Sequence, residues 1–90
     1  MVDTKTIEFM TRNEADMAFK KRVQTIFDWV NPTDASVILD IPCGRGFYLN
    51  MFRYVSPGCK IIGAELDTQV MRKAQANVGH LNLPLHQANL

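Results

Sequence analysis

Residues 37–46 constrain the fold more than any other segment, because their character changes twice over a short distance. They read VILDIPCGRG, an apolar run that is interrupted only by Asp40 before two glycines follow. The β-branched residues predict a strand, and Gly44 and Gly46 predict a tight turn because glycine adopts backbone conformations that other residues avoid. A strand that enters such a turn and then a helix brings bare backbone N–H groups close to a small ligand.

The composition describes one modest globular unit. Apolar residues make up 47% and charged residues 21% of the 90 residues, which is enough for one core and too little for two full domains. Ten Lys and Arg against nine Asp and Glu leave a formal charge of +1, so charge implies neither a nucleic acid nor a membrane as partner. No apolar run is long enough for a membrane span and the N-terminal region is too charged for a signal peptide, so we expect a cytoplasmic protein.

The cysteines and histidines do not form a recognisable metal site. Cys43, Cys59, His80 and His86 lack the spacing of metal ligands, so no metal is expected. Both cysteines lie in or beside apolar segments, which favours reduced, buried thiols over a disulfide. Cys43 is expected to fill space in the turn rather than act as a nucleophile, because no histidine is near it in the sequence.

Residues 1–36 predict a helical segment. A helix is expected to begin at Asn13, which could cap it, and to end at the Asn31-Pro32 pair. Apolar residues recur along it at intervals of three or four and form one face: Ala15, Phe19, Val23, Ile26, Phe27 and Val30. A shorter helical turn is predicted over residues 4–10.

Residues 37–90 alternate between predicted strands and helices. Strands are expected over 37–41, 60–66 and 83–90, with helices over 47–55 and 68–78. This alternation predicts an α/β fold, a partial doubly wound parallel sheet of three strands in the order 3-2-1. The apolar run of the first strand predicts burial on both faces. Thr68 is expected to cap the last helix and Gly79 to end it. In such a sheet a ligand lies beyond the carboxyl ends of the strands.

The acid and glycines that follow the first strand resemble the signature of the class I S-adenosylmethionine-dependent methyltransferases, which are Rossmann-like. That signature is D-x-G-x-G-x-G, and here it reads Asp40-Ile41-Pro42-Cys43-Gly44-Arg45-Gly46. The last two glycines match, and Pro42 stands in place of the first. The resemblance covers residues 37–90 and implies S-adenosylmethionine as the cofactor and methyl transfer as the reaction.

The resemblance implies that the first turn binds the methionine part of the cofactor. Asp40 would bind or orient the amino group, because a carboxylate beside a cation forms a charge-assisted pair. Gly44 and Gly46 would let the backbone approach the cofactor closely. Pro42 would line the same turn and stiffen it, since its ring fixes one backbone dihedral.

The same resemblance assigns the nucleoside part of the cofactor to the ends of the next two strands. Glu65 would accept hydrogen bonds from the two ribose hydroxyls, a role that needs two oxygens close together. Leu66 would lie against the adenine face. Asn89 stands where the family often has an acid that accepts from the adenine amino group, and an amide oxygen can do the same.

Two other functions stay open. One is an NAD-binding oxidoreductase fragment, but its G-x-G-x-x-G fingerprint would need a glycine at Leu49, and Asp40 would repel a pyrophosphate. The other is a non-catalytic nucleotide-binding or oligomerisation module, since the family builds its acceptor pocket largely from elements after the third strand.

These considerations set the expected organisation of the chain. We expect a helical segment over residues 1–36 and, over residues 37–90, the cofactor-binding part of a longer methyltransferase that is inactive as the isolated chain. An exposed apolar first strand would also favour self-association through that edge. No residue can be assigned to catalysis. A small-molecule methyl acceptor is the expectation, with no nucleic acid and no membrane as partner.

Overall fold

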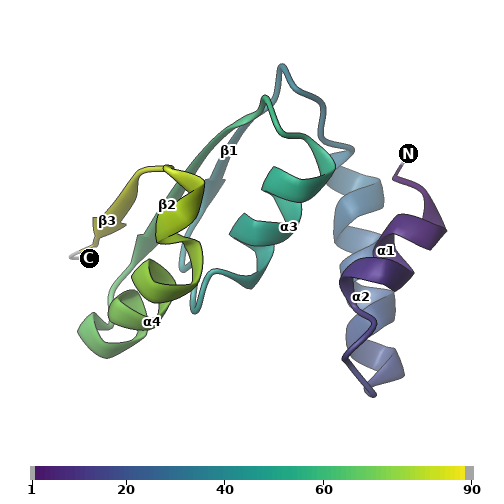
Figure 1. Cartoon of the computed structure of the whole chain (residues 1–90), viewed down its shortest axis with the longest axis horizontal. Helices are drawn as coiled ribbons and strands as arrows, with labels where there is room; N and C mark the ends of the chain where they lie inside the picture. Colours follow the sequence, from purple (N-terminus) through teal and green to yellow (C-terminus); the bar gives the residue numbers. More distant parts are fainter. Residues whose placement is uncertain (1, 89–90) are drawn as a thin grey trace. The chain divides into compact units, whose positions relative to one another are not determined.

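The computed structural model describes residues 2–88. The chain divides into two compact units, residues 1–32 and residues 33–90, and each is described by itself (Figure 1). Within the described residues, no helix has both the length and the apolar character needed to cross a membrane.

The N-terminal unit is a pair of helices, α1 (Thr4–Met10) and α2 (Met17–Val30), which contact each other. Helix α1 occupies the residues predicted for the short helical turn, and the Asp3 carboxylate caps it by accepting a hydrogen bond from the Lys5 N–H at 2.9 Å. Helix α2 buries Val23 and Phe27, two members of the apolar face predicted from the sequence.

The predicted start of α2 at Asn13 is wrong. Asp16 is the cap, and its carboxylate accepts hydrogen bonds from the N–H groups of Ala18 and Phe19. Asp and Asn are comparable N-caps, so composition alone does not choose between two that lie three residues apart. The predicted end is confirmed, because Asn31 follows the helix in the left-handed conformation with φ of 45°.

The C-terminal unit contains a parallel sheet of β1 (Val37–Asp40), β2 (Lys60–Glu65) and β3 (Leu85–Gln87), in the order β1-β2-β3 (Figure 1). Helix α3 (Phe47–Val55) connects the first two strands, and α4 (Thr68–Val78) with a short 3-10 turn, η1 (Gly79–Leu81), leads to the third. Both helices contact β2. The predicted α/β fold, with three strands in one parallel sheet, is confirmed.

The strand register places the predicted site on the helix-covered face of the sheet. Asp40 of β1 is aligned with Gly63 of β2, and aligned residues of parallel strands point to the same side. A Cβ atom added to Gly63 would lie 2.8 Å from a methyl group of Leu49 in α3, so this face of β2 packs on α3. Asp40 therefore shares the face on which the crossover helix lies.

The prediction that β1 is buried on both faces is wrong for the described residues. Val37 is 71% exposed and Leu39 is 63% exposed. Their side chains alternate with those of Ile38 and Asp40 and so point away from the face that packs on α3. An apolar strand can thus form without burial of both faces. Self-association through this edge stays a prediction.

The N-terminal cap of α4 also differs from the prediction. Asp67 rather than Thr68 is the cap, since its carboxylate accepts from the N–H groups of Gln69 and Val70. The predicted end is confirmed, since α4 ends at Val78 and Gly79 is its C-cap, although Gly79 keeps the right-handed helical conformation with φ of −55°. The left-handed residue is Asn82, with φ of 54°, at the end of η1.

Substitution of Gly63 tests the packing of the sheet against α3. In Gly63→Ala the new methyl group would meet side-chain carbons of Leu49 and Leu85, each at 2.8 Å. We expect a loss of about 1–3 kcal/mol in the free energy of unfolding, measured in urea, because overpacking forces side chains off their rotamers. The matched control is Gly79→Ala, where an added Cβ meets nothing within 4 Å in a helical conformation. That variant should gain about 0.4–1 kcal/mol, and an equal loss in both variants would contradict the packing assignment.

Candidate functional site

The glycine turn joins β1 to α3 beyond the carboxyl end of the sheet. The Cys43 N–H donates to the Ala64 carbonyl of β2 at 2.8 Å, and the Gly46 N–H donates to the Cys43 carbonyl at 3.1 Å. Gly44 and Gly46 both have positive φ, 56° and 92°. The turn predicted at these two glycines is therefore present. Only glycine adopts such a pair of conformations at little cost.

The two glycines of the turn have different surroundings. A Cβ added to Gly44 would meet nothing within 4 Å, so the space beside this backbone is open. A Cβ added to Gly46 would lie 2.6 Å from Cγ1 of Val78 in α4. Gly44 therefore fits the close approach of a ligand, whereas Gly46 has a packing role inside the protein that the sequence did not indicate.

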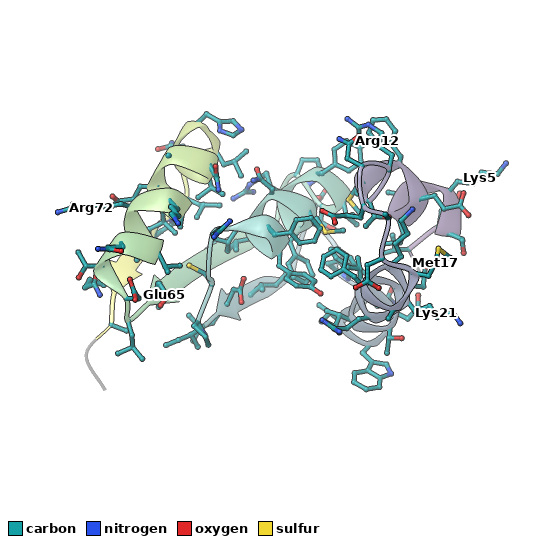
Figure 2. The ribbon with its side chains drawn as sticks, turned by 90° about the horizontal axis from the view of Figure 1, so that it is seen from below. Lys5, Arg12, Met17, Lys21, Glu65 and Arg72 are labelled. Atoms are coloured by element: carbon teal, nitrogen blue, oxygen red, sulfur yellow. The ribbon has the colours of Figure 1, made fainter. Side chains whose placement is uncertain are left out.

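Glu65 lies at the end of β2 (Figure 2), and its carboxylate connects two turns through hydrogen bonds. Its side chain is 6% exposed, Oε1 accepts a hydrogen bond from the Gly44 N–H at 3.1 Å, and Oε2 accepts one from the Asp67 N–H at 2.9 Å. Each carboxylate oxygen keeps acceptor capacity for one more hydrogen bond. The carboxylate is thus held in one orientation with both oxygens able to accept from further donors.

Asp40 is a second carboxylate at this end of the sheet. Burial raises the pKa of Asp40 above its ordinary value of 3.8. Within residues 2–88, no hydrogen-bond donor contacts its side chain. Burial, followed by the charges of Asp40 and Glu65, also raises the pKa of the Cys43 thiol. Two carboxylates near one thiol make this end of the sheet electronegative, which suits a ligand with a positive charge.

The remaining predicted residues surround these two acids. Pro42 is exposed in the turn, and its peptide bond with Ile41 is cis. Leu66 is 46% exposed directly after Glu65, an accessible apolar side chain beside the carboxylate. Asn89 lies outside the described residues, so its predicted contact with adenine stays a prediction.

Gln87, the last residue of β3, also belongs to this site, although no sequence pattern indicated it. Its side-chain amide donates to the Glu65 carbonyl at 3.1 Å and to the Leu66 carbonyl. Asn77 of α4 was not indicated either, and its amide donates to the Arg45 carbonyl at 2.9 Å, which ties the glycine turn to α4. The sequence carried no signal for Gln87, because the third strand was expected over residues 83–90, whereas β3 spans Leu85–Gln87 and so ends at this residue.

The structure offers no metal centre within residues 2–88, where no group of three or more His, Cys, Asp and Glu side chains could hold an ion. Cys43 and Cys59 are both buried and free, as the sequence predicted. Met51 and Met71 are buried, whereas Met17 is 64% exposed. Met17 comes first in α2, where fewer neighbours can cover it.

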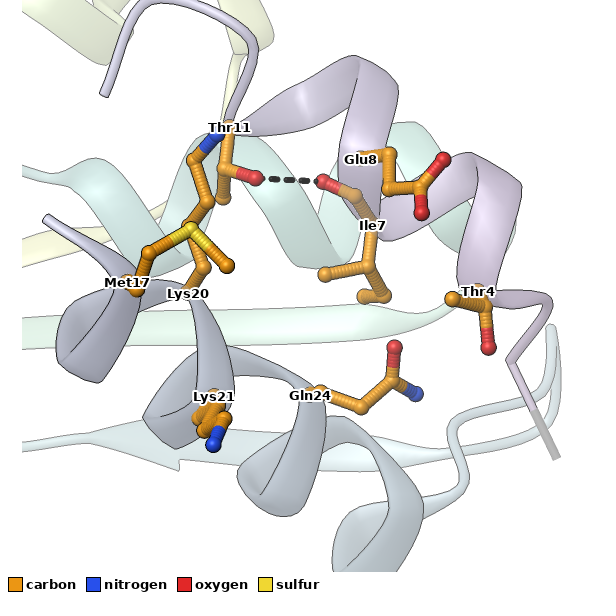
Figure 3. A pocket seen from close by; sticks show the side chains of 8 residues that line it. All are labelled: Thr4, Ile7, Glu8, Thr11, Met17, Lys20, Lys21 and Gln24. Carbon is orange, nitrogen blue, oxygen red and sulfur yellow. Dashed lines mark hydrogen bonds between the residues drawn. The ribbon is translucent and has the colours of Figure 1, made fainter. Parts of the chain in front are cut away.

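A separate concavity of about 200 Å³ lies between α1 and α2 in the N-terminal unit (Figure 3). Its walls are mainly apolar, and it contains none of the predicted cofactor-binding residues. Its lining consists of Thr4, Ile7, Glu8, Thr11, Met17, Lys20, Lys21 and Gln24.

No protein-family model matches the sequence. Two curated relatives are methyltransferases. The chain is 32% identical over 53 residues to ribosomal RNA small subunit methyltransferase H of Thermotoga neapolitana, a match that covers 59% of this chain and 18% of the relative. It is 38% identical over 60 residues to an uncharacterized RNA methyltransferase of Chlamydia muridarum, covering 66% of this chain and 14% of that protein.

Solved structures share the fold. The crystal structure of Streptomyces venezuelae DesVI matches 99% of this chain with a TM-score of 0.62 at 23% identity, over 37% of its own length. A SAM-dependent methyltransferase from Aquifex aeolicus matches 99% of this chain with a TM-score of 0.56 at 17% identity, over 47% of its length.

The curated relatives confirm a resemblance to methyltransferases in sequence, and the solved structures confirm the Rossmann-like α/β fold. The chain spans less than a fifth of the length of the two curated relatives and less than half of the two solved structures.

The difference between Gly44 and Gly46 predicts unequal effects of the same substitution. Gly44→Ala should cost about 1–2 kcal/mol of unfolding free energy, the penalty for a left-handed residue with a Cβ. Gly46→Ala should cost about 2–4 kcal/mol, since a less favourable conformation is combined with the clash against Val78. Urea unfolding of both variants measures the difference. Equal losses would mean that Val78 does not restrict position 46.

The raised pKa of Asp40 predicts that the stability of the folded chain falls as the pH rises. Because its folded-state pKa is raised, the folded chain retains a proton that the unfolded chain releases above about pH 3.8. The loss of unfolding free energy therefore develops as the pH rises from the ordinary pKa of Asp40 through its raised folded-state pKa. Above that pH the loss stays constant. Asp40→Asn should raise Tm by a few degrees at pH 7 and by less at pH 3. Thermal unfolding at both pH values tests this.

Glu14→Gln is the control for the loss of one acidic charge, because Glu14 is exposed in the loop between α1 and α2. It should leave Tm nearly unchanged at both pH values. A lower Tm for Asp40→Asn at pH 7 would show that the carboxylate stabilises the free protein.

Proposed function

We propose that this chain is the cofactor-binding part of an S-adenosylmethionine-dependent methyltransferase. The observation that carries the proposal is the Glu65 carboxylate, held by backbone N–H groups from two turns beyond the carboxyl end of the sheet. A ligand that presents two adjacent hydroxyl groups, as a ribose does, fits the remaining acceptor capacity of such a carboxylate. The methyltransferase names of the curated relatives support the same reaction class.

The methionine end of the cofactor is assigned to the first turn. Asp40 is a partly buried carboxylate whose pKa is raised by burial, and an ammonium group beside it would stabilise its charged form. Gly44 offers an open approach to the backbone, since a Cβ at that position meets nothing within 4 Å. The electronegative surroundings also suit the positive sulfonium of the cofactor.

When bound, S-adenosylmethionine supplies an activated methyl group on its sulfonium. The residues of this chain would bind and orient it: Asp40 at the amino group, Glu65 at the ribose and Leu66 at the adenine face. Orientation accounts for much of the rate in such a transfer because it fixes the donor in line with the nucleophile. We assign no catalytic residue to the chain.

The dinucleotide alternative is disfavoured by the packing of α3. Its fingerprint places a third glycine where Leu49 stands, and Leu49 is fully buried against Gly63 of β2. The close approach of helix and strand is thus made by a glycine on the strand rather than on the helix. Two carboxylates at the turn would also repel a pyrophosphate.

The methyl acceptor that we propose is a small molecule, because the formal charge of +1 provides no basic field for a polynucleotide. RNA is the alternative acceptor, since both curated relatives have RNA methyltransferase names. A non-catalytic nucleotide-binding or oligomerisation module is the alternative for the chain as a whole.

Calorimetric titration of the 90-residue chain with S-adenosylhomocysteine, adenosine and NAD tests the proposal. We expect S-adenosylhomocysteine to bind and NAD to bind more weakly or not at all. Asp40→Asn should weaken S-adenosylhomocysteine about tenfold or more through loss of a charge-assisted hydrogen bond, but should leave adenosine unchanged because adenosine has no amino-acid part. Glu65→Ala should abolish binding of both.

Asp40→Asn is the decisive variant, since Glu65→Ala also removes the acceptor of two backbone N–H groups and could unfold the turn. Glu14→Ala, in an exposed loop of the other unit, is the matched control and should bind like the original chain. Tighter binding of NAD would favour an oxidoreductase fragment, and binding of none of the three ligands would favour a non-catalytic module.

A further inference from the structure

Gln87 makes two hydrogen bonds that neither the sequence nor the resemblance assigned. Gln87 is the last residue of β3 and is aligned with Glu65, the last residue of β2. The two strands lie side by side in the sheet (Figure 1). The amide Nε2 donates to the carbonyls of Glu65 and Leu66. Both partners are acceptors only, so the nitrogen of the amide, not its oxygen, must face them.

These bonds hold one peptide group at both of its ends. The carbonyl of the Leu66–Asp67 peptide accepts from Gln87, and the N–H of the same peptide donates to Oε2 of Glu65 at 2.9 Å. The preceding carbonyl, that of Glu65, accepts from Gln87 and from the Ala88 N–H at 2.8 Å. A rotation of the Leu66–Asp67 peptide plane would therefore break the bond to Gln87 and release one oxygen of the Glu65 carboxylate together.

From this connection we infer that Gln87 is a positioning residue for the nucleoside end of the cofactor. It acts through the Leu66–Asp67 peptide, which fixes the orientation of the Glu65 carboxylate and the direction of the Leu66 side chain. Gln87 need not touch the ligand. This inference rests on the proposed function, because it assigns a role in the same cofactor site.

The test compares a variant that lacks the donor with one that restores it. Gln87→Met keeps the length of the side chain and removes the N–H group, and Gln87→Lys supplies a donor again. We expect Gln87→Met to weaken binding of S-adenosylhomocysteine and adenosine by the same factor, about tenfold, as expected from the loss of one or two neutral hydrogen bonds. Gln87→Lys should stay within about threefold of the original chain.

A purely structural role would not produce this pattern. Asp40→Asn should weaken only S-adenosylhomocysteine, whereas Gln87→Met should weaken both ligands, so the two variants separate the two ends of the cofactor. In the ligand-free protein, the amide resonance of Asp67 should shift in Gln87→Met, which reports the altered peptide directly. Gln75→Met is the matched control, since Gln75 is an exposed glutamine on α4, and it should change neither affinity nor the Asp67 resonance.

The outcomes separate this inference from the proposed function. If the original chain binds S-adenosylhomocysteine and Gln87→Met binds it equally well, the positioning role is overturned and the cofactor site stands. Equal weakening in Gln87→Lys and Gln87→Met would also overturn it, because a restored donor should restore affinity. If the original chain binds neither S-adenosylhomocysteine nor adenosine, the proposed function fails and the positioning role fails with it.

Discussion

The Glu65 carboxylate connects the parts of the candidate site, because its two oxygens accept from the N–H groups of Gly44 and Asp67. One bond reaches the turn between β1 and α3, and the other reaches the turn that starts α4. Two turns that are far apart in the sequence are therefore fixed by one buried side chain. Its orientation in turn depends on the Leu66–Asp67 peptide, whose carbonyl is held by Gln87 at the end of β3.

Close packing of small residues brings these turns into range of one another. Gly63 lets Leu49 of α3 and Leu85 of β3 approach the middle strand, and Gly46 makes room for Val78 of α4. Both contacts are too short to admit a Cβ atom. Gly44 is the exception, since the space beside it is open. The same residue type thus packs helices at two positions and leaves room for a ligand at a third.

Much of the C-terminal unit could be predicted from local patterns. Helix α3 spans the predicted residues, and the sheet has the predicted parallel order. Errors concentrated where two residues compete for one role, as when Asp67 caps α4 in place of Thr68. They also arose where burial depends on neighbours in space, as with Val37, which its sequence pattern would place in the core and which is 71% exposed.

By itself the sequence determined the strand, the glycine turn and the two acids at the ends of neighbouring strands, because strand propensity, glycine and charge act over a few residues. Only the tertiary structure decided that Glu65 is anchored by Gly44 and Asp67, that Gly46 packs on Val78, and that Gln87 holds the end of β2. These contacts join residues that are close only after the parallel crossovers have formed. Their geometry depends on the register of the strands and the packing of the helices, which no local sequence pattern specifies.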